Sequence, residues 1–308
     1  MKEIIKITVG LTMTCLIAAA IMGGVFIVTA KAKKHNEYVN FQENMLKLLG
    51  FDQNNPAPED LQLCTVYRYL IHQDSKISLG YMIPVQPSDS DETIMYQLLL
   101  VNIQGEFVAR HDLNISLTQA NDENDRKKAI TDVLSGEAVQ IEFADQFIVA
   151  KNGKERLAFL LPGKTPGFKT HINFMMAMNA NYAIVGLQIL EHQEDPGLGA
   201  EIEQEYFKNQ FIGKDVERIK TLKVIKEPLP DEQLKFLERK KWIDNDFSDD
   251  KINELQKKYQ SKDICAITGA TISSVAVVNG VKNVATKFVY RVKVLENIIS
   301  KQNISVAF

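Results

Sequence analysis

The sequence predicts an α+β fold with an apolar N-terminal helix, a series of short strands and a long C-terminal helix. Three observations support this prediction. Residues Ile7–Ala30 form an uncharged run of 24 residues. Apolar runs of strand length, separated by turn residues, recur between Cys64 and Leu190. From Val275 to Ile299, apolar residues recur at the spacing of a helix.

The apolar run Ile7–Ala30 is long enough to cross a bilayer as a helix. Lysines flank it on both sides, so charge does not set its orientation. A cleavable signal peptide is the competing interpretation, because Ala30-Lys31-Ala32 fits a small-x-small cleavage site. The apolar core is longer than the roughly 7–15 residues of such peptides. We therefore expect an uncleaved anchor at residues 1–34, which contacts membrane lipid through residues 7–30.

Size and composition bound the remaining chain. Its 308 residues, 45% of them hydrophobic, can bury one sizeable core or two smaller ones. A net charge of −3 gives no electrostatic reason to expect nucleic-acid binding. The three cysteines, Cys15, Cys64 and Cys265, are far apart, which argues against an iron–sulfur or zinc site built from this chain. A disulfide between Cys64 and Cys265 stays open.

The elements after the anchor follow from local patterns. A helical apolar pattern predicts a stalk helix in His35–Gly50, within a stalk and linker region at residues 35–60. Residues Asp122–Leu134 are expected to form a short helix, and Pro162–Phe168 a loop. The pair Asn152-Gly153 is typical of a hairpin turn. Strands are expected at Cys64–Ile71, Leu79–Val85, Tyr96–Ile103, Val139–Phe143, Gln146–Ala150, Leu157–Leu161, His171–Met178 and Tyr182–Leu190.

A charge-rich segment at about residues 226–262 has the character of an insertion. Two amphipathic helices are expected in it, Asp231–Lys241 and Ser248–Gln260, and Trp242 lies between them. A solvated structural excursion is the default interpretation. Docking to a partner subunit is the alternative.

The stretch Thr268–Ser274 joins a short strand-like run, Asp263–Ile267, to the long C-terminal helix. Ser273 and Ser274 are candidate N-caps of that helix. The N-terminus of a helix has unpaired N–H groups and a partial positive charge, so a phosphate can bind there. The alternative is a capped helix start without a ligand.

Within this stretch, Gly269 and Ala270 keep bulky side chains away from the helix start. Thr268 precedes them, and Thr271 offers a hydroxyl group. These features make the turn accessible to a phosphorylated ligand.

A second stretch, Glu191–Gly199, follows the last predicted strand. Gly197 and Gly199 flank Leu198, so the backbone can approach a planar ligand while the leucine packs on it. An ordinary Pro-Gly turn is the alternative. His192 with Glu191 and Glu194 also suggests a metal site, although such trios are more often solvated turns.

Both stretches resemble motifs of one family. Residues 268–274 resemble the Ser/Thr-Gly-Ala-Thr-x-Ser/Thr motif of periplasmic flavin-binding domains, which include the G subunit of Rnf electron-transport complexes and the C subunit of the sodium-pumping NADH:quinone reductase. Residues 192–199 resemble the His-x-Glu-Thr-Pro-Gly-Leu-Gly segment of these proteins, with Asp195 in place of the threonine.

The resemblance implies a mostly antiparallel sheet with flanking helices over residues 61–308. It also implies FMN attached to Thr271 through a phosphoester, which a separate flavin transferase would install. Such a chain relays electrons within a membrane complex and is not a stand-alone enzyme. Its main domain lies on the periplasmic side of the inner (cell) membrane. The other cofactor-binding residues that the motifs imply are Thr268, Gly269, Ala270, Ser273, Ser274, Gly197, Leu198 and Gly199.

Two departures keep alternatives open. The run Ile172–Gly199 favours the Rnf protein over the quinone-reductase protein, whose Gly-Leu-Trp stretch is absent near Gly163–Phe168. Cys265 stands where the family has an aspartate, six residues before Thr271. We expect this change to weaken flavin attachment, with Asp263 supplying part of the missing charge. A membrane-tethered scaffold module with a vestigial flavin site is therefore the alternative function.

Overall fold

The computed structural model describes residues 2–52, 55–73, 76–86, 94–134, 139–238 and 247–308. The chain divides into two compact units, Met1–Lys47 and Leu48–Phe308. Trp242 and the end of the expected helix Asp231–Lys241 lie outside the described residues.

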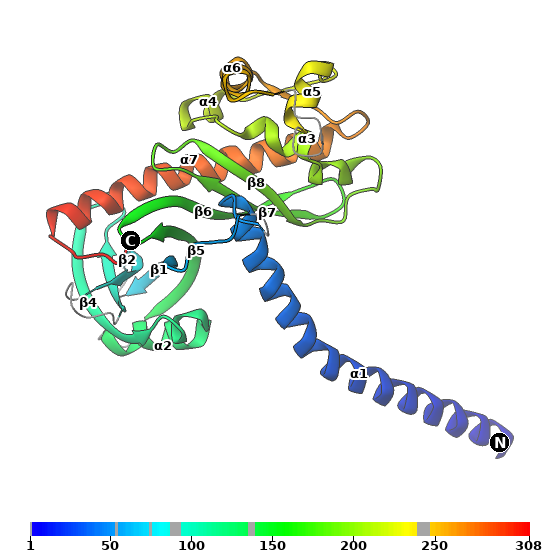
Figure 1. Cartoon of the computed structure of the whole chain (residues 1–308). Coiled ribbons are helices and arrows are strands. Elements are labelled where there is room, and N and C mark those ends of the chain that lie inside the picture. Colours follow the sequence, from blue (N-terminus) through cyan, green and yellow to red (C-terminus); the bar gives the residue numbers. More distant parts are fainter. Residues whose placement is uncertain (1, 53–54, 74–75, 87–93, 135–138, 239–246) are drawn as a thin grey trace. The chain divides into compact units, whose positions relative to one another are not determined.

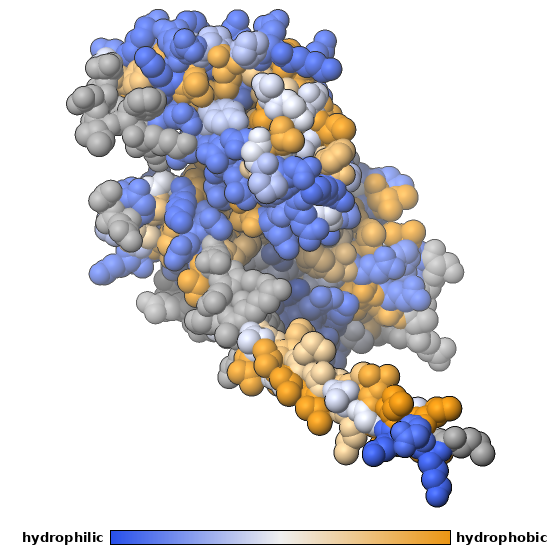
Figure 2. Space-filling view, turned by 90° about the vertical axis from the view of Figure 1, so that its right-hand side faces the viewer, coloured by the Kyte–Doolittle hydropathy of each residue, from blue (hydrophilic) through white to orange (hydrophobic). Residues whose placement is uncertain are grey.

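The first unit is helical. Helix α1 (Lys2–Leu48) continues without a break from the apolar run into the predicted stalk. Its part Lys2–Ala30 is, among the described residues, the one helix that is long and apolar enough to span a membrane. Exposed apolar side chains run along it (Figure 2). Ile7 is 69% exposed and Phe26 is 71% exposed. Water solvates such a surface poorly, so a lipid environment suits the helix.

The second unit is built on one antiparallel sheet. Among the described residues, eight strands form it in the order β4-β3-β2-β1-β5-β6-β7-β8, so two four-stranded meanders join where β1 pairs with β5 (Figure 1). The antiparallel sheet that the family resemblance implies is therefore confirmed. The strands are β1 (Leu61–Gln73), β2 (Lys76–Val85), β3 (Met95–Val101), β4 (Phe107–Ser116), β5 (Gln140–Asn152), β6 (Glu155–Pro166), β7 (His171–Met178) and β8 (Ile184–Glu191).

Both faces of the sheet are covered. In β2, Tyr81 and Ile83 belong to the larger core under α7 (Thr271–Lys301), whereas Met82 belongs to the smaller core under α2 (Glu123–Val133) (Figure 1). This alternation follows from the two-residue period of a strand. It explains why the strand runs are apolar on both faces.

Helix α7 lies close to the sheet because two glycines leave room for one ring. A Cβ atom on Gly163 of β6 would lie 2.2 Å from the Phe174 ring, and one on Gly280 of α7 would lie 2.8 Å from it. Further along, Thr165 Oγ1 donates a hydrogen bond of 3.1 Å to Ala276 O. These contacts fix the first turns of α7 against β6.

Between β8 and α7, the described part of the chain forms short helices and a two-stranded sheet. Strands β9 (Val224–Ile225) and β10 (Ile264–Cys265) pair in parallel. In the sequence, the charged segment 226–262 lies between these two strands. The remaining elements are η1 (Gln119–Asn121), η2 (Gly199–Glu203), α3 (Glu205–Lys208), η3 (Asn209–Phe211), α4 (Val216–Thr221), α5 (Asp231–Leu237) and α6 (Asp249–Gln260).

The described parts of the charged segment, residues 226–238 and 247–262, include packed as well as exposed side chains. Phe236 of α5 and Leu255 of α6 share a small core. Lys214 Nζ donates three hydrogen bonds to carbonyl oxygens at the end of α6, those of Tyr259 (3.1 Å), Gln260 (2.9 Å) and Lys262 (2.6 Å). Burial is the main cause that lowers the pKa of Lys214, to about 8.

Several predicted elements change at their boundaries. The expected strands Val139–Phe143 and Gln146–Ala150 are one strand, β5, because β5 pairs with β1 from Gln140 to Asn152, with one irregularity in register. The expected loop Pro162–Phe168 is wrong as far as Pro166, because β6 continues through it. Pro162 is tolerated because, among the described residues, this half of β6 pairs only with β7 and its other edge has no partner strand. The hairpin at Asn152-Gly153 is confirmed.

Candidate functional site

Three segments that are distant in the sequence meet at the start of α7. They are the turn after β6, closed by a 2.6 Å hydrogen bond from Gly167 N to Thr170 O; the loop after β8 at residues 192–199; and residues 268–274. The two stretches singled out in the sequence are thus brought into contact by the fold.

Glu194 links all three segments. Its side chain is buried, with the residue only 5% exposed. Oε1 accepts hydrogen bonds from the backbone N–H groups of Phe168 (2.9 Å) and Lys169 (3.2 Å). Oε2 accepts a hydrogen bond from the Ser273 hydroxyl. A buried carboxylate held by three donors therefore joins the turn after β6 to the first turn of α7.

The two serines of the motif are not N-caps, which corrects the sequence prediction. The residue in the N-cap position is Ala270, which makes no side-chain cap. Ser273 instead donates its hydroxyl hydrogen to the Glu194 carboxylate. Ser274 lies one turn into the helix, where its Oγ donates to Ala270 O (3.0 Å) and accepts from Ile267 N (3.1 Å). The two hydroxyls brace the turn from inside.

The first N–H groups of α7 consequently remain available. Within the described residues, the first recorded backbone bond of the helix start is from Ser274 N to Ala270 O (3.1 Å), and the N–H groups of Thr271, Ile272 and Ser273 have no recorded acceptor. Such groups carry the partial positive charge of a helix N-terminus. The start of α7 can therefore bind an anion.

The two glycine-containing turns pack against each other. Gly269 has φ +76°, and a Cβ atom there would lie 2.9 Å from Leu198 Cδ2. A Cβ atom on Gly199 would lie 2.8 Å from Ser273 Oγ and 2.9 Å from Glu194 Oε2. Gly197, at φ +71°, has open space around it and is needed only for its backbone conformation.

Thr271 stands at the rim of this arrangement and is partly exposed. Large apolar side chains from each segment are exposed: Phe168 (58%), Leu198 (46%) and Ile272 (59%). Exposed apolar side chains brought together by separate segments are typical of a ligand-binding surface. Thr268 is exposed on the same turn, and Ala270 is buried.

The histidine and acidic residues of the second stretch contact one another. His192 Nε2 lies 2.8 Å from Glu203 Oε1, and Nδ1 accepts from Glu194 N at 3.0 Å. Asp195 pairs with Lys169 at 2.5 Å. Glu191 accepts from Asn173 Nδ2 at 2.9 Å, away from His192. In the described part of the chain, no group of three or more His, Cys, Asp or Glu side chains could hold a metal ion.

Cys265 lies in β10, the short strand that leads to the motif, and Asp263 directly precedes that strand. Cys265 is buried, and its N–H and C=O groups bond the side-chain amide of Gln210 at 2.8 and 3.3 Å. Both Cys64 and Cys265 are free thiols, and burial raises the pKa of each. Asp263 Oδ1 accepts from Arg218 Nη2 at 2.5 Å and from Lys223 N at 3.0 Å. Its charge is therefore balanced by Arg218.

The sequence patterns do not reveal the role of two residues. They place Glu194 only in a candidate metal trio, and Phe168 only in a loop. The role of both depends on contacts between segments that lie far apart along the chain. The family motif does contain the glutamate, which is the one available signal for Glu194.

Comparison with known proteins agrees with the motifs. Residues 167–286 match the model of the FMN-binding domain family. Over 133 residues the chain is 28% identical to the G subunit of the proton-translocating ferredoxin:NAD(+) oxidoreductase complex of Clostridium ljungdahlii, covering 43% of this chain and 54% of that protein. Over 204 residues it is 22% identical to the C subunit of the Na(+)-translocating NADH-quinone reductase of Yersinia pestis, covering 65% of this chain and 66% of that protein. The chain thus spans less than two thirds of either relative.

Solved structures include two similar chains. NqrC of Shewanella oneidensis is 15% identical, with a TM-score of 0.33 over 47% of this chain and 56% of that one. The C subunit of the Na(+)-translocating NADH-quinone reductase of Parabacteroides distasonis is 18% identical, with a TM-score of 0.35 over 67% of this chain and 77% of that one. The matched family region contains the turn after β6, the loop after β8 and the start of α7. The family model that residues 167–286 match is therefore the one that the two motifs resemble, an FMN-binding domain.

Proposed function

We propose that this chain is a membrane-anchored flavoprotein subunit that holds FMN covalently at Thr271 and relays electrons within an ion-translocating complex of the Rnf type. The observation that carries the proposal is the meeting of residues 192–199 and 268–274, which Glu194 and Ser273 join directly. Residues 1–34 serve as the anchor, 35–60 as stalk and linker, and 61–308 as the FMN-binding domain.

The residues at the start of α7 suit the phosphate end of FMN. The Thr271 hydroxyl is the group that forms the phosphoester. A phosphodiester keeps one negative charge, which the unpaired N–H groups of the first turn and the helix dipole favour. Ser273 and Ser274 keep their hydroxyls turned inward, to Glu194 and Ala270 respectively, so Thr271 is the accessible hydroxyl of the helix start.

The surroundings of Thr271 suit the flat ring of the cofactor. Phe168, Leu198 and Ile272 offer exposed apolar surface. Gly269 and Gly199 allow the backbone to approach the cofactor ring closely. Gly197 shapes the turn after β8, and Thr268 shapes the turn before α7. When bound, FMN supplies the electron-transfer chemistry, while the chain orients the cofactor and excludes water from part of it.

The location and partners follow from the same proposal. Residues 7–30 of α1 contact lipid, the FMN-binding domain lies on the periplasmic side, and other membrane subunits of the complex exchange electrons with it. A separate flavin transferase installs the phosphoester. The Rnf type is favoured over the quinone-reductase type because identity to the Clostridium protein is 28%, against 22% to the Yersinia protein.

Covalent flavin tests the proposal. The full chain is co-expressed with a flavin transferase and run on a denaturing gel, where in-gel fluorescence marks attached flavin. Thr271→Val should abolish the fluorescence. The matched control Thr286→Val, further along α7 and outside the residues assigned to flavin, should keep it. Fluorescence that persists in Thr271→Val rules out the assignment. A dark wild-type band beside a labelled control flavoprotein would favour the scaffold module with a vestigial site.

A further inference from the structure

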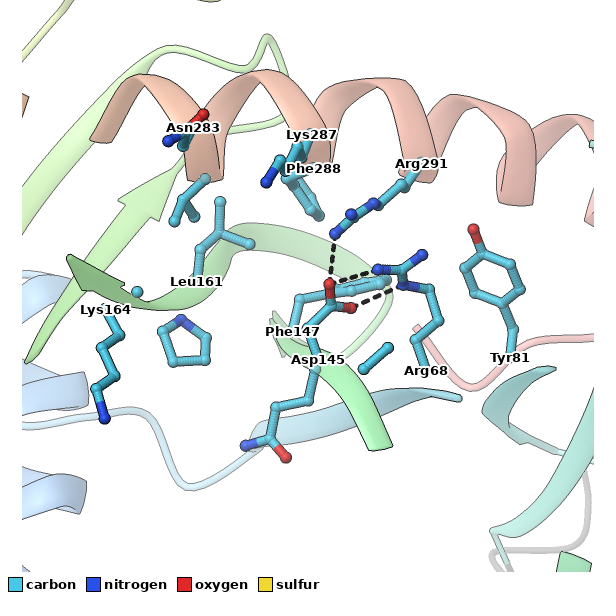
Figure 3. Close-up of a pocket in the computed structure, with 15 residues that line it drawn as sticks. Arg68, Tyr81, Asp145, Phe147, Leu161, Lys164, Asn283, Lys287, Phe288 and Arg291 are labelled. Atoms are coloured by element: carbon cyan, nitrogen blue, oxygen red, sulfur yellow. Dashed lines mark hydrogen bonds and ion pairs between the residues drawn. The ribbon is translucent and has the colours of Figure 1, made fainter. Parts of the chain in front are cut away.

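A cavity lies between α7 and the sheet, away from Thr271. Its volume is about 360 Å³. Strands β1, β2, β5 and β6 form its floor, and α7 forms its wall through Asn283, Val284, Lys287, Phe288 and Arg291 (Figure 3). Asn283 comes 12 residues after Thr271 in the helix, which is roughly 18 Å along its axis. The cavity is therefore distinct from the proposed flavin site.

An ion triad forms one side of this cavity. Arg68 donates to both oxygens of Asp145, from Nε at 2.8 Å and from Nη2 at 2.6 Å. Arg291 reaches down from α7, and its Nη1 also donates to Asp145 Oδ2 (Figure 3). Arg68 is buried, at 8% exposure, so its charge is held rigidly by the carboxylate. Burial lowers the pKa of Arg291, although Asp145 opposes the change.

The cations exceed the anions. Four cationic side chains line the cavity, from Arg68, Lys164, Lys287 and Arg291, and the one carboxylate among the lining residues is Asp145. Among the described residues, Arg291 has no recorded acceptor besides Asp145, which leaves its Nε and Nη2 donors for another group. Lys164 and Lys287 likewise have no recorded ion pair within the described ranges, and both are exposed. The cavity thus carries uncompensated positive charge.

Apolar side chains complete the lining. Phe147 and Phe288 pack edge to face, with ring centroids 5.2 Å apart, and Leu161 lies in the same lining. A concave site of this size with an apolar floor and a few convergent charges is the usual form of a small-molecule site. The apolar floor suits a carbon body, and the cations suit an oxyanion attached to it.

We propose that this cavity binds a small organic oxyanion, an apolar body that carries a phosphate or carboxylate group. The oxyanion pairs with Arg291 and Lys287, and the apolar body lies on Phe147 and Phe288. Arg68 and Asp145 hold Arg291 in place. The site does not depend on flavin at Thr271.

Titration calorimetry on the full chain in a neutral detergent at low salt tests this site, with phenyl phosphate and benzoate as probes. We expect saturable binding of at least one probe in a one-to-one ratio. Lys287→Gln and Arg291→Gln should each weaken it by about tenfold, since each removes a charge-assisted contact. Lys301→Gln makes the same charge change at the end of α7, outside the cavity, and should leave affinity unchanged. Thr271→Val should also leave it unchanged.

Specific outcomes would overturn the assignment. These are the absence of saturable binding of both probes in the wild type, or equal weakening by Lys301→Gln and Lys287→Gln. Phenol that binds as tightly as phenyl phosphate would remove the role of the charge. Inorganic phosphate that binds as tightly would remove the role of the apolar body. Circular dichroism of each variant establishes whether it is folded. If Arg291→Gln does not fold, Lys287→Gln alone still tests the site.

Discussion

The carboxylate of Glu194 accepts the hydroxyl hydrogen of Ser273, although the two residues are 79 positions apart in the sequence. This bond joins the Pro-Gly-Leu-Gly segment to the first turn of α7. The same carboxylate holds the turn after β6 through Phe168 N and Lys169 N. Glu194 is therefore the residue that sets the position of Thr271 relative to the surrounding apolar side chains.

Removing this carboxylate should loosen the site. Glu194→Ala leaves two partly buried N–H groups and one buried hydroxyl without their acceptor, at a cost of about 2–4 kcal/mol in the free energy of unfolding. Glu194→Gln keeps one carbonyl oxygen for Phe168 and Lys169 and should cost less. Chemical denaturation measures the stability of both variants, and in-gel fluorescence measures their flavin. A Glu194→Ala protein with wild-type stability and loading would show that the bond to Ser273 does not matter.

Gly269 combines a positive φ angle with a close neighbour, and two variants separate these effects. Gly269→Ala should cost about 1–2 kcal/mol for the backbone conformation, and more for the contact with Leu198 Cδ2. Adding Leu198→Ala should relieve only the contact, because it leaves the φ angle unchanged. Gly153→Ala is the control, since Gly153 has φ +57° and open space around it. Equal losses in Gly269→Ala and Gly153→Ala would contradict a role for Leu198.

Asp263 should make stability depend on pH in the acid range. Partial burial raises the pKa of Asp263, but hydrogen bonds from Lys223 N and Arg218 outweigh burial and hold it below the ordinary value of 3.8. The folded protein thus binds fewer protons than the unfolded chain, so this contribution is present above about pH 4 and fades as pH falls through the folded pKa. The carboxylate is 27% exposed, so Asp263→Asn should cost only about 1 kcal/mol at pH 7.

The measurement for Asp263 is the difference in free energy of unfolding between wild type and Asp263→Asn at several pH values. The difference should shrink below pH 4 and vanish under the folded pKa. Glu254→Gln, in an exposed pair with Lys251, is a suitable control. A difference that grows on acidification would contradict the pairing with Arg218.

The topology of the anchor gives a further expected result. A reporter enzyme that is active only outside the cytoplasm, fused after Phe308, should be active. Sequencing of the mature N-terminus should find the chain uncleaved, because Ile7–Ala30 is longer than the apolar core of a signal peptide. Activity of a cytoplasmic reporter, or a chain that begins at Lys33, would contradict the proposed orientation or the anchor.

The sequence by itself determined the features that depend on neighbouring residues. Apolar runs of strand length, bounded by turn residues, located most of the strands, and the strand His171–Met178 was predicted with its observed bounds. The length of Ile7–Ala30 indicated a membrane-spanning helix, and Thr268–Thr271 indicated a turn into a helix. Backbone propensity, turn chemistry and hydrophobic period act over a few residues, so a sequence displays them directly.

Only the tertiary structure decided which side chains meet. The serines expected to cap α7 instead bond Glu194 and Ala270, because packing of the loop after β8 buries them. Pro162 continues a strand because, in the described part of the chain, that half of β6 has a partner strand on only one side. Arg68, Asp145 and Arg291 come from β1, β5 and α7 and form a charged cavity that no local pattern indicates. The energy of such contacts depends on burial and on partners from distant segments, which exist only once the sheet and α7 have packed together.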